Sequence, residues 1–367
     1  MKNNKTIFIT GGHFTPAISI YKKLEKYNKY NLYYIGVKHT ILFDKSYSQE
    51  YIYSKKNNIN FLSISTGKLY RYIGIEAILS LIKIPIGFIQ SLLYIIKYKP
   101  SLIIAFGSYV SVPIILSAKI FNIKIYSHIQ TIQPGISDKI SSKYSNKIFI
   151  SWKETEQYIK NKNKTVYTGN ILRDEVFANN TNEFDFQNND PILYITGGNQ
   201  GSYTINQIIF KSLEPLLTQY NIVHQIGTNT IYKDYDKSLK LKDQLENKLK
   251  NKYIPKENIW GNGVGEILNK SDIIIGRSGA NTVYEVLALN KKAIFIPLSN
   301  GGKNDQKYNS KLAQKYSSTI EIIDENDLNY DTLKSEIEKL LSKKNHSNIK
   351  IPLDAKETIS EYIINNI

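Results

Sequence analysis

The chain of 367 residues contains no cysteine, one methionine and two tryptophans. The absence of cysteine excludes disulfide bonds, thiolate metal sites and cysteine nucleophiles, and it fits a reducing compartment. The N-terminus runs from Met1 to Lys5 straight into a short strand-like segment, without the apolar core and cleavage site of a signal peptide. No dense cluster of Asp, Glu and His marks a cation site, so we expect neither a metal ion nor another cofactor.

Positive charge is in excess, with 48 Lys and Arg against 32 Asp and Glu and a formal net charge of +16. Such a balance is compatible with nucleic acid, anionic lipid or an anionic substrate as partner. The lysines are scattered, however, and Lys, Asn, Ile and Tyr are abundant together, as an AT-rich genome would produce. No basic run interleaved with aromatic residues marks a strand-binding groove, so we expect no nucleic-acid partner.

Apolar, β-branched runs alternate with helical or loop segments along the whole chain. The first run ends at Gly11-Gly12-His13, and a helix is predicted from Pro16 to about Lys29. This alternation predicts a parallel sheet with helices on both faces. The expected strands are 6–10, 31–36, 61–65, 102–106, 124–129, 147–151 and 165–168, followed by 192–196, 222–226, 258–260, 272–276, 293–297 and 319–323.

The same architecture restarts at Ile192, after a polar, Asn-rich segment. The prediction is an α/β protein of two Rossmann-like, doubly wound domains with an interdomain cleft. Ligands of such sheets bind beyond the carboxyl ends of the strands, where the turns at Gly11, Gly197 and Ser278 are expected. We expect an N-terminal domain over 1–178, a linker over 179–191, a C-terminal domain over 192–345 and a tail over 346–367 that returns to the N-terminal domain.

A Ser-Gly-Ala turn follows the apolar run 272–276 and precedes a predicted helix. Backbone N–H groups at the start of such a helix form an anion site that suits a diphosphate. Glu285 lies about one turn into the helix, where its carboxylate could accept two sugar hydroxyls. The alternative is that Gly279 only eases a tight turn and Glu285 is solvated.

The stretch 73–96 is apolar and long enough to suggest a transmembrane helix. Glu76 and Lys83 fall inside it, and charges in the middle of a membrane helix cost about 2.5–3.5 kcal/mol each. Because Pro85 also interrupts the stretch, we predict two amphipathic helices with Pro85 near the start of the second. Part of their wide apolar face is expected to rest on an anionic membrane, unless the face packs wholly against the sheet. The expected contacts are Ile75, Leu79, Ile82 and Ile86.

Seven short motifs occur in order over residues 6–310, and together they resemble the MurG family. Members of this family are bacterial transferases that add N-acetylglucosamine to the lipid-linked muramyl-peptide precursor of peptidoglycan. The motifs are Gly11-Gly12-His13 with Pro16-Ala17, Gly107-Ser108-Tyr109-Val110-Ser111, His128-Ile129-Gln130, Gly169-Asn170-Ile171-Leu172-Arg173, Gly197-Gly198-Asn199-Gln200-Gly201, Ser278 to Glu285, and Asp305-Gln306 with Asn309.

The resemblance implies the GT-B architecture and an inverting, metal-independent hexosyltransferase. The donor, UDP-N-acetylglucosamine, would bind mainly to the C-terminal domain, and the acceptor would bind to the N-terminal domain. The implied reaction converts lipid I to lipid II in peptidoglycan synthesis. It would take place at the cytoplasmic face of the inner membrane, with the enzyme attached peripherally to an anionic surface.

The resemblance also assigns donor-side residues. Ala280 and Asn281 would present N–H groups to the diphosphate, and Glu285 would accept the ribose hydroxyls. Asp305 and Gln306 would read the sugar hydroxyls. The remaining donor-side residues are Arg173 near the uridine or a phosphate, Asn199 near the diphosphate, Gly261 beside the uracil, and Ser278 and Thr282 of the turn.

On the reaction side, His13 is the best-placed base for the proton that the attacking hydroxyl loses. Helix capping or phosphate contact is the alternative for His13. Thr10 would also face the reaction centre, whereas a structural role is expected for His128. The expected acceptor-side residues are Gly12, Tyr109, Gln130 and Thr131.

Two departures from the family pattern fall on the acceptor side. The family's first turn has a double-glycine pair where this chain has Phe8-Ile9, and it often has His-Glu-Gln-Asn where this chain has His128 to Thr131. The acceptor is therefore the more open question. The alternatives are a related GT-B transferase with another lipid-linked or glycolipid acceptor, a UDP-sugar epimerase of similar fold, and a nucleotide-sugar binding protein without turnover.

Overall fold

The computed structural model describes residues 4–39, 47–68, 74–178, 181–299, 304–344 and 349–367. The chain divides into two compact units, Met1–Arg173 with Pro352–Ile367, and Asp174–Ile351. The segment that we expected to be a linker therefore belongs to the second unit. Within it, Phe184 is fully buried, and the backbone N–H groups of Glu183 and Phe184 donate to the Glu266 carboxylate at 3.2 Å each.

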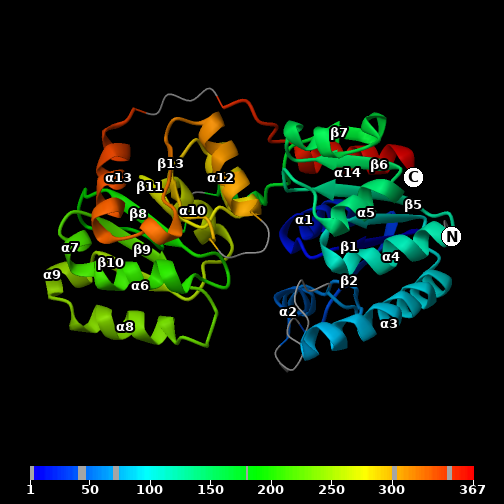
Figure 1. Cartoon of the computed structure of the whole chain (residues 1–367), viewed down its shortest axis with the longest axis horizontal. Coiled ribbons are helices and arrows are strands. Elements are labelled where there is room, and N and C mark those ends of the chain that lie inside the picture. Colours follow the sequence, from blue (N-terminus) through cyan, green and yellow to red (C-terminus); the bar gives the residue numbers. More distant parts are fainter. Residues whose placement is uncertain (1–3, 40–46, 69–73, 179–180, 300–303, 345–348) are drawn as a thin grey trace. The chain divides into compact units, whose positions relative to one another are not determined.

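The first unit contains a seven-stranded parallel sheet in the order β3-β2-β1-β4-β5-β6-β7 (Figure 1). The chain leaves β1 toward β3 and then returns to place β4 on the other side of β1. The topological switch point, where doubly wound sheets bind ligands, therefore lies between β1 and β4. The strands are β1 (Lys5–Thr10), β2 (Tyr30–Gly36), β3 (Phe61–Ser63), β4 (Leu102–Ala105), β5 (Lys124–Ile129), β6 (Lys147–Ile150) and β7 (Thr165–Tyr167).

Alternate residues of these strands fill two apolar layers, because successive side chains of a strand point to opposite faces. On one face, Ile7 and Ile9 pack under α1 and α14, and α14 (red in Figure 1) contacts α1 directly. On the other face, Phe8 and Ile103 pack under α3 and α4. The helices of this unit are α1 (Phe14–Glu25), α2 (Gln49–Lys56), α3 (Ile75–Tyr98), α4 (Ser108–Ile120), α5 (Ile136–Tyr144), the short 3₁₀ helices η1 (Lys153–Tyr158) and η2 (Lys162–Lys164), and α14 (Ala355–Asn366).

The second unit repeats this design with six parallel strands in the order β10-β9-β8-β11-β12-β13, so its switch point lies between β8 and β11. The predicted strand at 258–260 is wrong, because the strand at this place, β10, covers Tyr253–Lys256. Pro255 hid it from the sequence pattern, since proline cannot donate to a sheet ladder, but β10 is an edge strand, where proline is tolerated. The other strands are β8 (Ile192–Thr196), β9 (Asn221–Gln225), β11 (Ile273–Gly276), β12 (Lys292–Phe295) and β13 (Ile320–Ile322).

The core of the second unit gathers the inner residues of β8, β9 and β11 against α6, α7 and α13. This packing fixes the strand ends that carry the turns at Gly197 and Ser278. The helices are η3 (Asp174–Phe177), α6 (Tyr203–Lys211), α7 (Leu213–Leu217), α8 (Asp234–Gln244), α9 (Asn247–Lys250), α10 (Asn262–Lys270), α11 (Ala280–Ala288), α12 (Asp305–Tyr316), η4 (Glu325–Asp327) and α13 (Tyr330–Ser342).

Helix α3 corrects the prediction of two helices, because it continues through Pro85 for 24 residues. Proline removes one hydrogen bond from a helix interior. Pro85 lies on the exposed side, where water can reach the carbonyl that loses its partner. Ile78–Tyr98 is long and apolar enough to cross a membrane by length and composition alone, a test that core helices of soluble proteins also pass.

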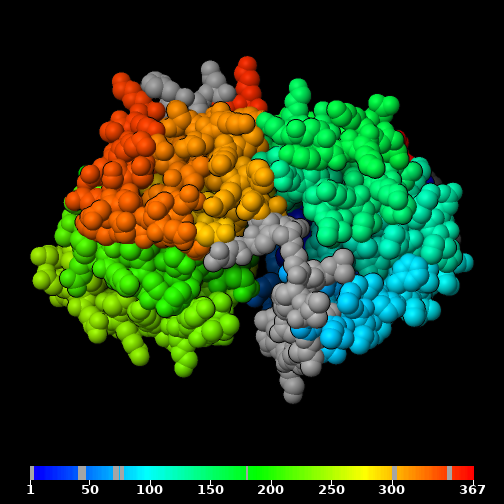
Figure 2. Space-filling view, viewed as in Figure 1, coloured from blue at the N-terminus to red at the C-terminus, as the bar shows by residue number. Residues whose placement is uncertain are grey.

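The face of α3 that packs on the rest of the first unit carries most of its polar side chains, together with the buried Ile95. Ser80 Oγ accepts a hydrogen bond from Lys68 N at 2.6 Å, and Tyr94 Oη donates to Ser63 O at 2.6 Å. Gln90 Oε1 accepts from Ser65 N at 2.8 Å. Helix α3 lies at the surface of its unit (sky-blue atoms in Figure 2). Its apolar face is turned outward, with side chains 44% to 59% exposed: Ile78, Leu81, Ile82, Ile86, Ile89, Leu93 and Ile96.

Candidate active site

Two turns meet at the switch point of the first unit, one after β1 and one after β4. Gly11 has φ +136°, and a Cβ there would lie 2.7 Å from the Phe106 carbonyl carbon. The Gly12 N–H donates to Gly107 O at 3.3 Å. Glycine is therefore required at residue 11, since only a backbone without Cβ can approach the second turn so closely. The two turns form one rigid platform under His13.

His13 occupies the N-cap position of α1 at the end of this platform, its side chain makes no capping hydrogen bond, and it is half-buried. Its Nδ1 lies 2.7 Å from Phe106 O. A carbonyl oxygen can only accept, so Nδ1 carries the hydrogen and Nε2 carries the lone pair of the neutral ring. This arrangement presents Nε2 as a proton acceptor, as a general base requires.

The turn after β4 contains a backbone conformation that the sequence did not reveal. Gly107 has φ +66° and Ser108 has φ +69°. A non-glycine residue with positive φ costs about 1–3 kcal/mol, and such residues cluster at functional sites. Ser108 contacts the point where a Cβ on Gly12 would lie, and Tyr109, expected on the acceptor side, follows it half-buried at the start of α4.

Asp138 is a second residue of this site that sequence reasoning missed. Its side chain is 8% exposed, and Oδ2 accepts from Gly135 N at 3.0 Å, which orients the carboxylate from the first turn of α5. A Cβ on Gly107 would lie 2.6 Å from Asp138 Oδ1 and 3.2 Å from His13 Nδ1. The carboxylate and the imidazole therefore flank the same point above Gly107. The only sequence signal was an acidic residue in the segment between the predicted strands 124–129 and 147–151.

A buried polar network ties the end of β5 to the turn after β7. His128 Nε2 donates to Gly169 O at 3.3 Å, and burial lowers the pKa of His128 to about 4 even though this hydrogen bond favours the charged form. Gln130 Nε2 donates to Asn170 Oδ1 at 3.1 Å, so the Gln130 side chain, expected to face the acceptor, has a bond inside the unit. Thr131 donates to Gln133 O at 3.1 Å.

The structure also describes the surroundings of Thr10 and Arg173, two further residues of this unit that were predicted to belong to the site. Thr10, the last residue of β1, is fully buried, and its hydroxyl has no hydrogen-bond partner in the described residues. Thr10 therefore packs beneath the two turns, and its side chain is not accessible to a substrate. Arg173 is half-buried and ends the segment that carries Asn170.

In the second unit, the turn after β8 packs tightly on the turn after β9. Gly201 and Gly227 have φ +79° and +99°, and a Cβ on either would overlap the backbone of the other turn. The Asn199 carbonyl oxygen accepts a hydrogen bond from Thr228 N at 2.9 Å. The Asn199 side chain is exposed. Ser202 Oγ then caps α6 by accepting from Ile205 N at 3.5 Å. The turn is thus held by backbone contacts, as a phosphate-facing loop needs.

The turn after β11 leads into α11, whose N-cap, Gly279, offers no side-chain cap. Ser278 is fully buried, and its hydroxyl donates to Gln306 O at 2.8 Å. Asn309 Nδ2 donates to Ser278 O at 3.1 Å. Ser278, predicted to contact the donor, is therefore a link between this turn and α12. Ala280, Asn281 and Thr282 form the half-buried first turn of α11.

An ion pair between Arg277 and Glu325 also holds the turn after β11. This pair was not predicted from the sequence. Arg277 Nη1 donates to Ile296 O at 3.0 Å, and Nη2 donates to Glu325 Oε1. Burial opposes the charged form of Glu325, but the hydrogen bonds from Arg277 and from Ser299 N outweigh it and lower its pKa to about 2. Glu325 therefore stays ionised over the physiological range, and its bonds with Arg277 and Ser299 anchor the ends of β11, β12 and β13 together.

The remaining donor-side predictions lie on three helices of the second unit. Glu285 is 5% exposed on α11, and Gly261 is the N-cap residue of α10, with φ +58° and open space at the position that a Cβ would take. Asp305 begins α12 half-buried, and Gln306 Oε1 accepts from Leu298 N at 3.0 Å. Within the described ranges, no three His, Asp or Glu residues gather as a metal site.

Comparison with known proteins places this geometry in a family. The glycosyltransferase family 28 N-terminal domain matches residues 10–150, and the C-terminal domain of the same family matches residues 192–362. A UDP-N-acetylglucosamine–N-acetylmuramyl-(pentapeptide) pyrophosphoryl-undecaprenol N-acetylglucosamine transferase from Borreliella afzelii is 32% identical over 95% of this chain and 92% of that protein. The transferase of the same name from Clostridium tetani is 34% identical over 86% and 85% of the two chains.

Solved structures agree on the fold. The crystal structure of Acinetobacter baumannii MurG is similar with a TM-score of 0.69 and 19% identity over 98% of this chain and 99% of that one. A UDP-GlcNAc 2-epimerase from Methanocaldococcus jannaschii has a TM-score of 0.60 and 15% identity over 99% and 100% of the chains. The predicted α/β fold of GT-B type and the resemblance seen in the sequence are thereby confirmed. The chain belongs to the MurG family of UDP-N-acetylglucosamine transferases, within glycosyltransferase family 28.

Proposed function

We propose that the chain transfers N-acetylglucosamine from UDP-N-acetylglucosamine to a lipid-linked muramyl-peptide acceptor, with His13 as general base. Membership of the MurG family supports the donor and the acceptor class. The observation that carries the mechanism is the hydrogen bond from His13 Nδ1 to Phe106 O, which leaves Nε2 to accept a proton.

In the proposed reaction, Nε2 of His13 accepts the proton of the acceptor hydroxyl as its oxygen attacks the anomeric carbon. The bond from that carbon to the phosphate oxygen breaks, and the electron pair leaves with UDP. A single displacement of this kind inverts the configuration at the anomeric carbon. Asp138, beside the imidazole, stabilises the imidazolium that forms and keeps the ring oriented, so we assign it as a positioning residue.

The leaving diphosphate gains negative charge, and the start of α11 is suited to receive it. The N-terminus of a helix carries roughly half a positive charge, and no side chain caps α11. The N–H groups of Ala280 and Asn281 contact the diphosphate, assisted by the Thr282 hydroxyl. The Arg277–Glu325 pair and the Ser278–Gln306 bond hold this turn before the donor arrives, so charge stabilisation costs little reorganisation.

The nucleoside and sugar are held by side chains around this turn. Glu285 accepts the ribose hydroxyls, and Gly261 leaves room for the uracil because nothing lies within 4 Å of its Cβ position. Asp305 and the amide nitrogen of Gln306 bind the sugar hydroxyls. Asn199 adds a further polar contact from the second unit. For Arg173, which belongs to the first unit, we keep the donor contact that the resemblance implies.

The test is a transfer assay with labelled UDP-N-acetylglucosamine and detergent-dispersed lipid-linked muramyl-pentapeptide. Wild type is expected to transfer the label, and His13→Ala is expected to lower kcat by about 10²- to 10⁴-fold with little change in donor affinity. His39→Ala is the matched control, since His39 lies in the same unit but outside the site. Turnover of His13→Ala at the wild-type rate would refute the base assignment.

The same assay without acceptor separates the alternatives. A transferase leaves the UDP-sugar intact until the acceptor is added, whereas an epimerase converts it alone and a pure binding protein consumes none in either case. Labelled product with a glycolipid but not with the muramyl-peptide would move the chain to a different acceptor class.

We further propose that α3 attaches the protein peripherally to an anionic membrane surface. Its apolar stripe is exposed while its polar face is bonded to the first unit, so the helix has the arrangement of one that lies on a membrane. Of the residues predicted to contact lipid, Ile82 and Ile86 are 56% and 44% exposed, and Leu79 is half-buried. The side chain of Ile75 lies outside those that the structure describes.

A further inference from the structure

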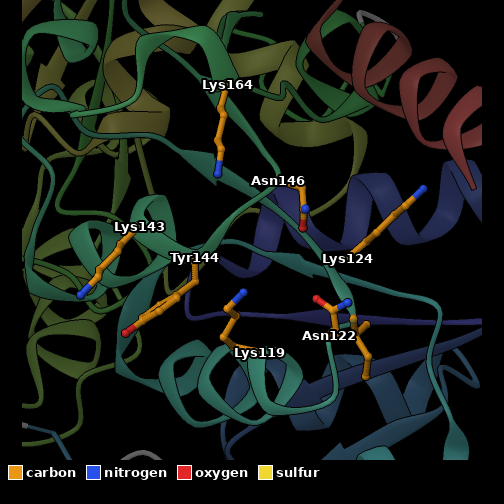
Figure 3. A pocket seen from close by; sticks show the side chains of 8 residues that line it. Lys119, Asn122, Lys124, Lys143, Tyr144, Asn146 and Lys164 are labelled. Atoms are coloured by element: carbon orange, nitrogen blue, oxygen red, sulfur yellow. The ribbon is translucent and has the colours of Figure 1, made fainter.

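A lysine-lined cavity lies at the edge of the first sheet opposite the active-site turns. It occupies about 360 Å³ around the residues that precede or begin β5, β6 and β7. Because all seven strands are parallel, these starts lie at the edge away from the carboxyl ends that carry His13. The lining residues are Lys119, Asn122, Ile123, Lys124, Lys143, Tyr144, Asn146 and Lys164 (Figure 3).

The charge of this cavity is of one sign. Its lining contains four lysines and neither Asp nor Glu. Among the described residues, none of these four lysines takes part in an ion pair, whereas Lys23, Lys252 and Lys256 of this chain each have a carboxylate partner. Like charges around one cavity repel each other, so an anion that enters it relieves this repulsion.

Four polar side chains converge on the middle of the cavity. Figure 3 shows Lys119 and Asn122 pointing into it from the end of α4, and Lys164 and Asn146 pointing toward them from the opposite side. Lys164 Nζ uses one hydrogen on Ser145 O at 3.0 Å, which fixes the side chain and leaves two donors. Asn146 Oδ1 accepts from Ile125 N at 2.9 Å, which orients its Nδ2 group as a donor.

Donors that converge from two sides suit a tetrahedral oxyanion such as phosphate. Ammonium groups supply charge to a phosphate, and amide N–H groups fix its orientation. The cavity volume is at the lower end of the range for small-ligand sites, which is about 300–1,000 Å³. A phosphate with a small polar substituent matches both the size and the chemistry.

Exposed apolar residues next in sequence to two lining residues indicate where such a phosphate comes from. Ile120 and Phe121, between Lys119 and Asn122 in sequence, are 64% and 45% exposed. Helix α4, which ends there, packs against α3. An exposed apolar pair next to a phosphate cavity matches the border between the acyl chains and the headgroups of a bilayer.

We propose that this cavity binds the phosphate of an anionic phospholipid headgroup. The proposal rests on the membrane attachment proposed for α3 and adds a discrete headgroup site to it. Lys119 and Lys164 provide the charge, Asn122 and Asn146 provide directed N–H donors, and Ile120 and Phe121 enter the adjacent apolar layer. Lys124 and Lys143 point away from the centre and stay at the rim.

The test compares Lys119→Gln/Lys164→Gln with Lys26→Gln/Lys29→Gln. Both pairs remove two charges, but Lys26 and Lys29 are exposed at the end of α1, on the other face of the sheet. Sedimentation with phosphatidylcholine vesicles, with and without phosphatidylglycerol, measures binding of the full chain. Because each lysine at an anionic surface contributes about a fivefold factor, the cavity pair is expected to lose about 30-fold in affinity for the phosphatidylglycerol vesicles.

The control pair is expected to lose less than about threefold, since its lysines face away from the proposed contact. Equal losses for the two pairs would overturn the cavity and leave only general charge attraction. Lys119→Gln alone, which disturbs no hydrogen bond within the unit, is expected to lose about fivefold. A wild-type affinity for this single variant, with only the double variant impaired, would show that the effect comes from the lost Lys164–Ser145 bond.

Calorimetry with glycerol 3-phosphate and with inorganic phosphate distinguishes a lipid from a free anion. Weak binding of glycerol 3-phosphate that is lost in the cavity pair supports the headgroup site. Binding of inorganic phosphate as tight as that of the vesicles would overturn the lipid assignment. The transfer assay in detergent runs in parallel, and the cavity pair is expected to keep wild-type turnover there. Failure of the proposed function would appear as absent turnover in every variant, independently of vesicle binding.

Discussion

The outward apolar stripe of α3 makes a prediction that can be calculated from exposed areas. Full burial of an isoleucine or leucine side chain stabilises by about 1.5–3 kcal/mol. Ile82 and Leu93 are 56% and 59% exposed, so each contributes about 1 kcal/mol when a bilayer covers it. Replacing both by serine should therefore lower the vesicle partition constant by about 30-fold, since 1.4 kcal/mol corresponds to a tenfold change.

The assay is sedimentation with phosphatidylglycerol vesicles at low and high salt, with thermal unfolding to show that the fold is intact. Because both residues are exposed, the melting temperature should not fall. The matched control is Ile231→Ser/Leu353→Ser, which changes an exposed isoleucine and an exposed leucine that do not belong to α3. High salt should weaken binding of wild type and variant alike, because it screens charge but leaves the apolar part in place.

The reasoning would be refuted if the α3 pair bound vesicles like wild type, or if the control pair lost as much. Turnover provides a second readout. With acceptor in vesicles the α3 pair should lose activity in proportion to its binding, whereas with acceptor in detergent it should match wild type. A loss in detergent as well would mean that α3 acts on the catalytic platform and not on the membrane.

Three further predictions concern stability and the base. Burial raises the pKa of Glu50 to about 7, so the folded chain holds this proton more tightly than the unfolded chain and the free energy of unfolding falls as pH rises from about 4.5 to 7. Glu50→Gln should raise the free energy of unfolding by about 2 kcal/mol at pH 8 and change it little at pH 4, measured by urea unfolding; equal effects at both pH values would contradict this. Gly227→Ala should destabilise by about 2 kcal/mol more than Gly198→Ala, since both glycines have positive φ but only Gly227 lies against another backbone; similar melting temperatures would count against the tight turn. Asp138→Asn should lower kcat by about tenfold and alter the pH profile of kcat while leaving the donor KM unchanged, because it removes the charge beside His13; an unchanged profile would reduce Asp138 to a structural role.

Much of the fold could be predicted because its signals are local. Apolar β-branched runs ending in glycine placed β1, β8 and β11 correctly, and the repeat of this unit after Ile192 predicted two sheets. The edge strand β10 was missed because Pro255 argues against a strand unless the sheet order is known. Sheet order depends on contacts between residues that are distant in sequence, so no local pattern contains it.

The candidate site, too, was predicted from the sequence only in part. The turns at Gly11, Gly197 and Ser278 could be predicted, since each combines a strand end, glycine and a helix start within a few residues. Asp138 and the Arg277–Glu325 pair could not, because their partners come from other elements. Folding also changed the expected use of Ser278, whose hydroxyl is bonded to Gln306 O.

Helix α3 shows most clearly what the sequence decides and what the tertiary structure decides. Spacing of polar residues every three or four positions determined that the segment is helical and amphipathic, although two helices were predicted where one forms. Periodicity cannot say which face points inward. That depends on whether the neighbouring backbone offers hydrogen-bond partners, and here Ser80 and Tyr94 find them along 63–68. The sequence by itself thus determined the two α/β sheets, their glycine turns and the family. Tertiary structure decided the tautomer of His13, the outward stripe of α3 and the lysine cavity, because each requires groups that only folding brings together.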